Sequence, residues 1–261
     1  MIKTVTCGVL EYLQAENISA AHCFTTRLGG VSTGNLASLN LGTHRGDDPE
    51  NVRKNYRILG NALGFDPKKL VLSKQKHTDI VLPVDKDHWG AGLFSPELPP
   101  CDALITNTPG TALAVFTADC TPILLHDPVT GAVGAVHAGW RGTANGIVAK
   151  TAEAMQTVYG CRPEDLCAAI GPNIGFCCFE TDEDVPHAMR EVFGNAAEEH
   201  IRKAGEKYYV NLKALNALHL QRAGVQKVEI STECTFCQSH RFWSYRKVGD
   251  ARGGQAAIIV A

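Results

Sequence analysis

The sequence has no cluster of basic residues and no long apolar run. Its 261 residues carry a formal net charge of -2 at pH 7, and no window holds the series of Lys and Arg side chains that would neutralise nucleic-acid phosphates. No stretch approaches the roughly 20 apolar residues that a membrane span requires. Residues 1–10 resemble neither a signal peptide nor a transit peptide. We therefore expect a cytoplasmic protein that binds neither nucleic acid nor a membrane.

Internal repeats and low-complexity linkers are also absent. The one proline-rich patch, residues 95–100, is too short to separate two domains. The apolar fraction of 44% is close to the globular average, and mixed sheet-and-helix folds routinely reach this length as one unit. We therefore expect a single catalytic domain over residues 1–261. The sequence predicts no particular oligomeric state.

Ten cysteines are present, and two sets of them are close in sequence: the adjacent pair Cys177 and Cys178, and the CxxC pair Cys234 and Cys237. Without an export signal, cysteines in a chain of this length are expected to be thiols or ligands rather than disulfides. A zinc ribbon needs two properly spaced pairs, and adjacent cysteines do not fit that spacing. A single CxxC is weak evidence of chemistry, so a structural or incidental role is expected.

Runs rich in Val, Ile and Leu predict strands in the middle and in the last third of the chain. The predicted strands are 111–117, 123–126, 132–137, 228–231, 241–246 and 256–260, with a turn at 127–131. Helical periodicity predicts helices over 147–159, 182–193 and 211–223. Because strands are both consecutive and separated by helices, the predicted fold class is α+β, with mixed sheets covered by helices.

Three residues with metal-binding or nucleophilic side chains lie at or beside predicted strands. Cys120 follows the strand 111–117, His137 ends the strand 132–137, and His77 precedes the apolar pair at 80–81. Strand ends joined by loops are where a scaffold places reactive groups. The thiol and an imidazole would form a Cys-His nucleophile, or all three side chains would bind a transition metal, zinc first, with a fourth position left for water or substrate. A buried thiol with two unrelated histidines fits the pattern equally well.

Two arginines beside glycines are candidates for substrate binding. Arg141 lies between glycines at an expected helix start, where unpaired N–H groups and the helix dipole attract an anion. Arg27 precedes Gly29 and Gly30, which permit a sharp turn and close backbone approach. Phosphate or a carboxylate would bind at Arg141, and an anion or a purine edge at Arg27. Ordinary turns with surface arginines remain the alternative at both positions.

Together these segments resemble the YfiH family, also called the laccase-domain or polyphenol-oxidase-like family, which includes the bacterial peptidoglycan editing factor. The pair TADC and HAGWRG is highly specific. The resemblance implies an α/β sandwich once grouped with cysteine hydrolases, in which layered mixed sheets are covered by helices. Thr78 and Arg45 depart modestly from the family pattern. The matching segments run almost end to end: 25–32 (TTRLGGVS), 38–42 (SLNLG), 46–49, 75–81 (QKHTDIV), 102–105, 117–120 (TADC), 137–142 (HAGWRG), 171–172, 178–180, 234–235 and 244–246.

The resemblance also implies a zinc site made of His77, Cys120 and His137, with copper as the alternative metal. It implies a purine nucleoside enzyme that phosphorolyses adenosine, inosine or methylthioadenosine, with phosphate as co-substrate, and that deaminates adenosine. Cys120 and His137 would then be catalytic as well as metal ligands. The expected partners are therefore small molecules.

Deamination requires a proton carrier beside a metal-activated water, and Asp119 is the candidate. Asp119 adjoins Cys120, and adjacent strand residues face opposite sides, which speaks against this assignment. The ordinary zinc deaminase signature is missing from the sequence. The substrate-binding candidates are Arg27, Asn40 and Arg141.

Other functional classes compete with this prediction. A multicopper phenol oxidase needs several HxH pairs, and the chain has no HxH, which favours one mononuclear site. A Cys-His hydrolase that edits cell-wall precursors would lose its activity when Cys120 is alkylated in the metal-free enzyme. A non-catalytic binding protein is the last alternative.

Overall fold

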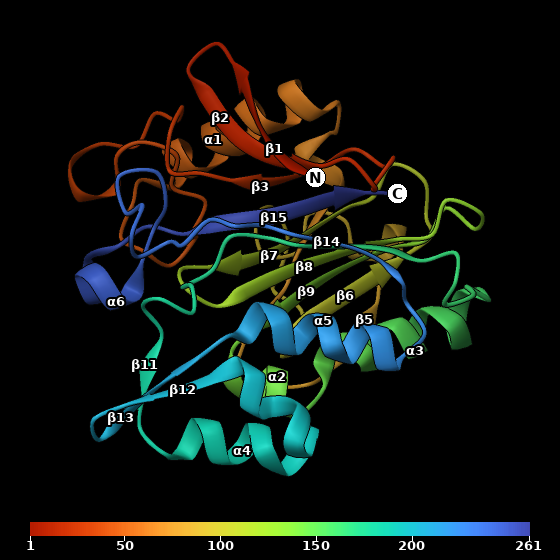
Figure 1. Ribbon diagram of the computed structural model, residues 1–261. Coiled ribbons are helices and arrows are strands. Elements are labelled where there is room, and N and C mark those ends of the chain that lie inside the picture. The colour runs from red at the N-terminus through yellow and green to blue at the C-terminus, as the bar shows by residue number, and fades with distance from the viewer.

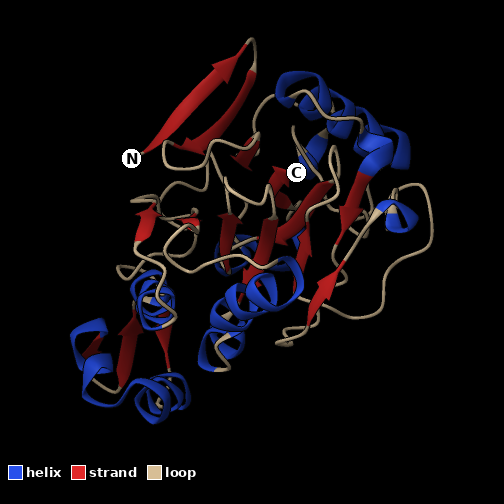
Figure 2. Cartoon of the chain, turned by 90° about the vertical axis from the view of Figure 1, so that its right-hand side faces the viewer, coloured by secondary structure: helices blue, strands red, loops and turns tan.

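The computed structural model describes residues 1–261 and contains two six-stranded sheets and a small three-stranded sheet (Figure 1). Helices lie outside the sheets, so the predicted α+β class is confirmed. Figure 2 shows the same arrangement from the side, with several strands side by side in the middle of the molecule and the hairpin near the N-terminus at its edge. None of the helices combines the length and the apolar character that crossing a bilayer requires.

The first six-stranded sheet joins the two ends of the chain. Its strands, in spatial order, are β1 (Ile2–Cys7), β2 (Leu10–Ala15), β3 (His22–Thr25), β15 (Gln255–Val260), β7 (Ala112–Thr117) and β4 (Leu70–Leu72). All neighbours are antiparallel except β4 and β7.

The second sheet is built from the middle of the chain. Its strands, in spatial order, are β14 (Lys227–Ile230), β10 (Cys167–Ile170), β8 (Thr121–His126), β9 (Val133–Ala138), β6 (Ala103–Thr106) and β5 (Val81–Pro83). The small third sheet consists of β11 (Glu180–Thr181), β13 (Lys207–Val210) and β12 (Ile201–Ala204).

The helices are distributed over the whole chain. They are α1 (Pro49–Leu63), α2 (Trp140–Ala144), α3 (Ile147–Tyr159), α4 (Asp184–Phe193), α5 (Leu212–Arg222) and α6 (Tyr245–Val248). Short 3₁₀ helices lie at Gly34–Leu36, Pro67–Lys69, Lys86–His88, Gly194–His200 and Gly249–Ala251.

The two large sheets pack face to face, and alternate residues of one strand serve two different cores. Leu113 and Val115 of β7 join the cluster between the sheets, whereas Ala112 and Ala114 face the outer cluster beneath α1. This explains why β7 is a nearly continuous apolar run, as expected for a strand buried on both faces. The outer face of the second sheet is covered by α3 and α5, for example through Met155. The predicted layered sandwich is therefore confirmed.

Most elements predicted from the sequence are present, with one exception. The strand predicted at 241–246 is wrong, because this segment forms no ladder and leads into α6. Ser244 caps that helix by accepting a hydrogen bond from the backbone N–H of Lys247 at 3.3 Å. The buried rings of Phe242 and Trp243 produce a strand-like apolar pattern, although they pack as parts of a loop.

Candidate metal centre and active site

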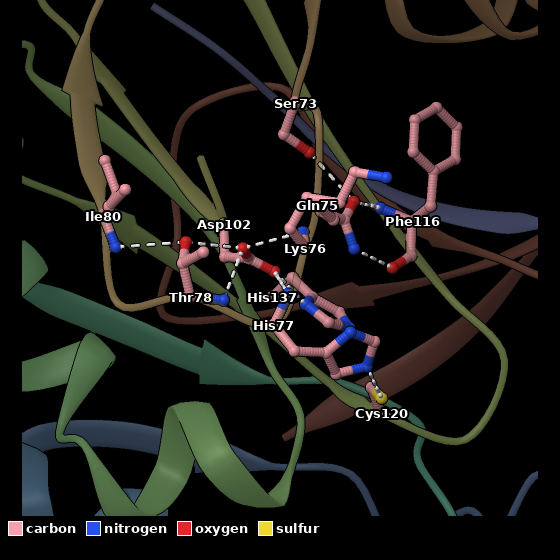
Figure 3. Close-up of polar contacts among 10 residues, drawn as sticks. All are labelled: Ser73, Gln75, Lys76, His77, Thr78, Ile80, Asp102, Phe116, Cys120 and His137. Atoms are coloured by element: carbon pink, nitrogen blue, oxygen red, sulfur yellow. Dashed lines mark hydrogen bonds and ion pairs between the residues drawn. The ribbon is translucent and has the colours of Figure 1, made fainter. Parts of the chain in front are cut away.

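The structure brings His77, Cys120 and His137 together at one end of the second sheet (Figure 3). His77 lies in the loop between β4 and β5, Cys120 in the bend between β7 and β8, and His137 on β9. Cys120 Sγ lies 3.7 Å from His77 Nε2, and the two imidazole rings stand edge to face with centroids 4.9 Å apart. All three potential ligand atoms lie within 4.8 Å of one another.

A fully buried carboxylate, Asp102, organises this arrangement. It accepts hydrogen bonds from the backbone N–H groups of Lys76, His77 and Thr78 at 3.0, 3.0 and 2.8 Å, and from the Thr78 hydroxyl at 2.7 Å. It also accepts one from His137 Nδ1 at 2.7 Å (Figure 3). Burial alone would raise the pKa of Asp102, but His137 and the other donors hold it well below its usual range. Asp102 therefore folds the His77 loop and orients His137.

The contact with Asp102 also decides which nitrogen of His137 is available. A carboxylate only accepts, so the proton lies on Nδ1 and the lone pair of a neutral ring lies on Nε2. A carboxylate behind a histidine ligand is the usual outer arrangement in metal sites. Sequence analysis assigned no role to Asp102. The only sequence feature that could have indicated one is the position of an acidic residue directly before an apolar strand.

Gln75 connects the same loop to the first sheet. Its amide accepts from the backbone N–H of Phe116 at 2.6 Å and donates to the carbonyl of Phe116 at 2.7 Å, as a neighbouring strand would (Figure 3). The Ser73 hydroxyl donates to the same amide oxygen at 2.9 Å. The loop that carries His77 is therefore attached to β7 by Gln75 and to β6 by Asp102.

The thiol of Cys120 and the imidazole of His137 are electrostatically coupled. Burial would raise the pKa of Cys120, but the positive charge and hydrogen bond of His137 lower it to about 6, with a smaller effect of His77. Burial would lower the pKa of His137, but the Cys120 thiolate and Asp102 raise it to about 9. The metal-free protein thus favours a thiolate, which is the form of cysteine that attacks carbon centres and binds metals.

Backbone conformation and space are both specialised at this centre. His77 and Asp119 are the two non-glycine residues with a left-handed backbone, at φ of 59° and 98°. Such outliers concentrate at functional sites. At Gly139 an added Cβ would lie 2.8 Å from His77 Cδ2 and 3.3 Å from Cys120 Sγ. The glycine of HAGWRG therefore leaves the space that the two candidate ligands occupy.

A cavity of about 770 Å³ opens over the three candidate ligands. Its size lies within the roughly 300–1,000 Å³ range of small-molecule sites. Its aromatic lining comes from Phe116, Trp140, Phe179 and Tyr245. Its basic lining comes from His44, Arg45, Lys74, Lys76, Arg141, Arg246 and Arg252. Glu97 and Asp119 are the only acidic residues in the lining.

The positive charges of the cavity are only partly balanced. Glu97 pairs with Lys74 at 2.9 Å and with His44 at 2.6 Å, whereas Arg45 and Arg252 form no ion pair. The Nε group of Arg252 is buried without a hydrogen-bond partner. Burial lowers the pKa of Arg252, and the neighbouring Arg45 adds to that effect. Such an excess of cationic groups in a half-enclosed cavity attracts an anion. Sequence analysis did not assign Arg45 or Arg252 to the site.

Of the arginines predicted to bind substrate, the structure brings only Arg141 to the cavity, where its guanidinium lies 4.1 Å from the ring centroid of Trp140. Arg27 lies outside the lining. Its guanidinium stacks on Trp243 at 3.7 Å and donates to the carbonyls of Ala37 and Ser239. Through these contacts Arg27 joins the loops that contain Ala37 and Ser239.

Asn40 lies behind the cavity wall and is fully buried. Its side-chain oxygen accepts from the backbone N–H groups of Gly42 and Gly254 at 3.0 and 2.9 Å. Both glycines line the cavity, and a Cβ added at Gly42 would lie 2.7 Å from Arg45 Cγ. Asn40 therefore does not line the cavity itself but supports the backbone of Gly42 and Gly254, which do.

The carboxylate of Asp119 is occupied by three donors. It accepts from the Thr235 hydroxyl at 2.6 Å, the Ser244 hydroxyl at 3.1 Å and the backbone N–H of Arg246 at 2.7 Å. These contacts place the start of α6, and with it Arg246, at the cavity. The expected alternation with Cys120 does not apply, because both residues lie in a bend rather than on a strand.

Comparison with known proteins gives concordant matches along the chain. The family model described as multi-copper polyphenol oxidoreductase laccase matches residues 21–261. A Bacteroides thetaiotaomicron protein named purine nucleoside phosphorylase is 37% identical over 242 residues, which cover 91% of this chain and 89% of that protein. Escherichia coli purine nucleoside phosphorylase YfiH is 35% identical over 252 residues, 97% of each chain. The crystal structure of YlmD from Geobacillus stearothermophilus superposes with a TM-score of 0.92 at 35% identity and covers 98% of both chains.

Proposed function

Because the chain belongs to the laccase-like YfiH family, we propose that it is a metal-dependent purine nucleoside phosphorylase. One observation carries the proposal: a cavity of about 770 Å³ that combines three converging metal ligands with arginines that no carboxylate neutralises. Phosphorolysis needs both features, since one substrate is an anion and the other is a nucleoside whose base must be activated as a leaving group.

The side chains present suit a zinc ion. A thiolate and two imidazoles are the ligands zinc prefers, and three protein ligands leave a fourth position for substrate or water. Asp102 behind His137 and the space at Gly139 agree with a site formed for an ion. When bound, zinc supplies a Lewis acid that polarises a substrate atom or activates water. Copper is the alternative metal, because thiolate and imidazole also suit copper.

The cationic wall would hold the phosphate. In phosphorolysis a phosphate oxygen bonds to C1′ of the sugar while the bond from C1′ to the base nitrogen breaks, and its electron pair leaves with the base. Arg45 and Arg252 are the groups best suited to bind phosphate, because neither has a carboxylate partner. Arg141 also lines the cavity and would add positive charge. The rings of Phe116 and Tyr245 offer apolar faces for the purine and sugar.

Adenosine, inosine and methylthioadenosine are the proposed nucleosides, and adenosine deamination is a proposed second reaction of the same cavity. In that reaction water replaces the amino group at C6 and ammonia leaves, so a group must carry protons between them. Asp119 is proposed for this role because it lines the cavity beside Cys120. The test is Asp119→Asn: loss of a proton carrier should lower inosine formation from adenosine more than phosphorolysis of inosine, whereas displacement of α6, which this carboxylate also holds, should lower both reactions.

The main experiment measures base release from purified protein of known metal content. Inosine is supplied with and without phosphate, and hypoxanthine and ribose 1-phosphate are quantified. We expect both products in equal amounts and only with phosphate. Cys120→Ala should lose activity together with bound metal. Arg252→Ala should raise the KM for phosphate and keep the metal. Cys7→Ser, a change at an exposed thiol of β1 that does not line the cavity, is the matched control.

Three outcomes would contradict this proposal. Base release that does not depend on phosphate, or no release by the metal-loaded protein, would exclude a phosphorylase. Activity that survives metal removal and is abolished by alkylation of Cys120 would favour a Cys-His hydrolase. One observation supports the hydrolase: Cys120 lies beside His137, and His137 is hydrogen-bonded to Asp102, as a nucleophile, a base and an orienting carboxylate would be arranged.

A further inference from the structure

Four cysteines outside the candidate active site converge although they come from two distant segments. Cys177 and Cys178 follow β10, and Cys234 and Cys237 follow β14. Cys237 Sγ lies 3.3 Å from Cys178 Sγ and 3.7 Å from Cys177 Sγ, and all four sulfur atoms lie within 4.8 Å of one another. The sequence spacing gave no reason to expect adjacent cysteines to act as a ligand pair, yet both sulfur atoms lie beside the CxxC pair. A tight turn, in which Gly175 O accepts from the N–H of Cys178 at 2.9 Å, directs both sulfurs to one point.

We propose that these four cysteines bind one zinc ion as a tetrahedral structural site, separate from the candidate active-site metal. Zinc–sulfur bonds of about 2.3 Å place tetrahedral sulfur ligands about 3.8 Å apart, which is close to the separations found here. Four protein ligands close the coordination shell, so this ion would take no substrate. The inference does not depend on the proposed phosphorylase activity.

The backbone around Cys234 is shaped for a thiolate. Its Sγ accepts a hydrogen bond from the N–H of Gly175 at 3.1 Å. Charged sulfur is stabilised by such donors, as outer contacts stabilise ligands in other metal sites. At Gly175 an added Cβ would lie 3.1 Å from Cys234 Cβ and 3.2 Å from Cys177 Sγ. Glycine therefore allows the two cysteine-bearing segments to approach each other closely.

A buried cation lies beside the cysteine cluster. The ammonium of Lys213 is buried and donates to the carbonyls of Ser231 and Glu233 at 2.7 and 2.6 Å, both within three residues before Cys234. Lys213 forms no ion pair with a carboxylate, and an uncompensated buried charge is costly. A zinc ion with four thiolates carries a net charge of -2. The site would therefore supply the negative charge that Lys213 otherwise lacks.

The zinc ion would hold together one wall of the active-site cavity. The cysteine segments already meet through the hydrogen bond from the N–H of Thr235 to the carbonyl of Asn173 at 2.9 Å. One segment continues to Phe179 and the other to Arg246, and both of these residues line the cavity. Arg246 also donates to the carbonyl of Glu180 at 2.9 Å. Since the two segments are about sixty residues apart in sequence, cross-linking them would restrict their motion considerably.

Metal counting on separate variants tests the proposal. Protein purified without chelator should contain two zinc ions per chain, and Cys120→Ala should retain one. Cys237→Ser should also retain one, and the control Cys7→Ser should retain two. Cobalt-substituted protein should show the strong visible absorption of a sulfur-rich tetrahedral site. That absorption should persist in Cys120→Ala and fall sharply in Cys237→Ser.

Several results would overturn the inference. Wild-type protein whose zinc is lost entirely in Cys120→Ala has no second site, and this measurement holds even if Cys237→Ser does not fold. An intact mass lower by two or four hydrogens, with no retained metal, would show disulfides among these cysteines. Iron in place of zinc would show another metal. Wild-type protein that holds only one zinc ion, which is fully retained in Cys120→Ala, would support this site and remove the metal from the proposed active site, so the two proposals fail separately.

Discussion

Replacing Asp102 by Asn tests whether one buried carboxylate assembles the candidate metal centre. The carboxylate receives five hydrogen bonds, two at Oδ1 from His77 N–H and His137 Nδ1, and three at Oδ2 from Lys76 N–H and from the N–H and hydroxyl of Thr78. Asn keeps the shape but turns one acceptor into a donor. In either orientation at least two donors lose their acceptor, and His137 can regain a partner by moving its proton to Nε2. Since each unsatisfied buried group costs about 1–3 kcal/mol, one or two unsatisfied groups should lower the free energy of unfolding by about 1–6 kcal/mol.

The metal affinity should fall as well. The less costly orientation places the new amide N–H₂ against His137 Nδ1, because only two donors meet there. The ring would then carry its proton on Nε2, which is the nitrogen needed for the metal. Loss of such an outer partner typically weakens metal binding by about 10- to 100-fold. The affinity is measured by competition with a chelator, and the stability by urea unfolding of the same samples.

Asp127→Asn is the matched control. Asp127 is also buried and accepts from the backbone N–H groups of Val129 and Thr130, but it belongs to the turn between β8 and β9. Both bonds go to Oδ1, which Asn retains, so Asp127→Asn should leave metal affinity unchanged. The pKa of Asp102 is held below its usual range, so its stabilisation is present above about pH 4 and is lost as the pH falls further. The Asn variant should lose less stability over that acidic range. Wild-type metal affinity in Asp102→Asn would refute this role.

Three further predictions concern single side chains. Gly139→Ala should displace His77 and weaken metal binding; the φ of -70° allows alanine without backbone strain, so the effect would come from the added Cβ. Gly142→Ala is the control, because the atom nearest to its added Cβ would be 3.4 Å away, and it should keep the metal. In the metal-free protein the pKa of Cys120 is lowered to about 6, so its thiolate persists until the pH falls through that value. The rate of alkylation mapped to Cys120 should therefore be half-maximal near pH 6. A midpoint near the usual cysteine pKa of about 8.5 would contradict the electrostatic coupling of Cys120 with His137. Arg27→Ala removes a stacked guanidinium and its hydrogen bonds, so the free energy of unfolding in urea should fall by about 2–4 kcal/mol while the KM for the nucleoside stays unchanged. A raised KM would instead support a role of Arg27 in substrate binding.

Local sequence pattern was sufficient where burial followed the strand or helix repeat. The strand β7 and the helix α3, which ends at Gly160 in a left-handed conformation, lie where the apolar pattern placed them. The pattern failed at 241–246, because the burial of Phe242 and Trp243 is created by distant segments. Trp243, for example, donates from its backbone N–H to the Gln255 side chain at 2.7 Å. No periodicity within the segment contains that information.

The candidate site shows the same division. Cys120 and His137 were predicted from their place at strand ends, and their convergence follows from the pairing of β8 with β9. Asp102 was not predicted, since its importance depends on a loop 25 residues earlier that turns around it. Arg45 and Arg252 were missed for the same reason. They lie near opposite ends of the sequence and become neighbours only in the folded chain.

The position of the candidate metal centre follows from how the chain passes between its two large sheets. The connection from β4 to β5 leaves the first sheet and enters the second, and it carries His77. The connection from β7 to β8 makes the same passage and carries Cys120. His137 comes from β9, which pairs with both β8 and β6. The three candidate ligands therefore meet where the two connections lie against the end of the second sheet. A bound ion at this point would link both connections to β9, so correct packing of the sheets and formation of the metal centre would depend on each other.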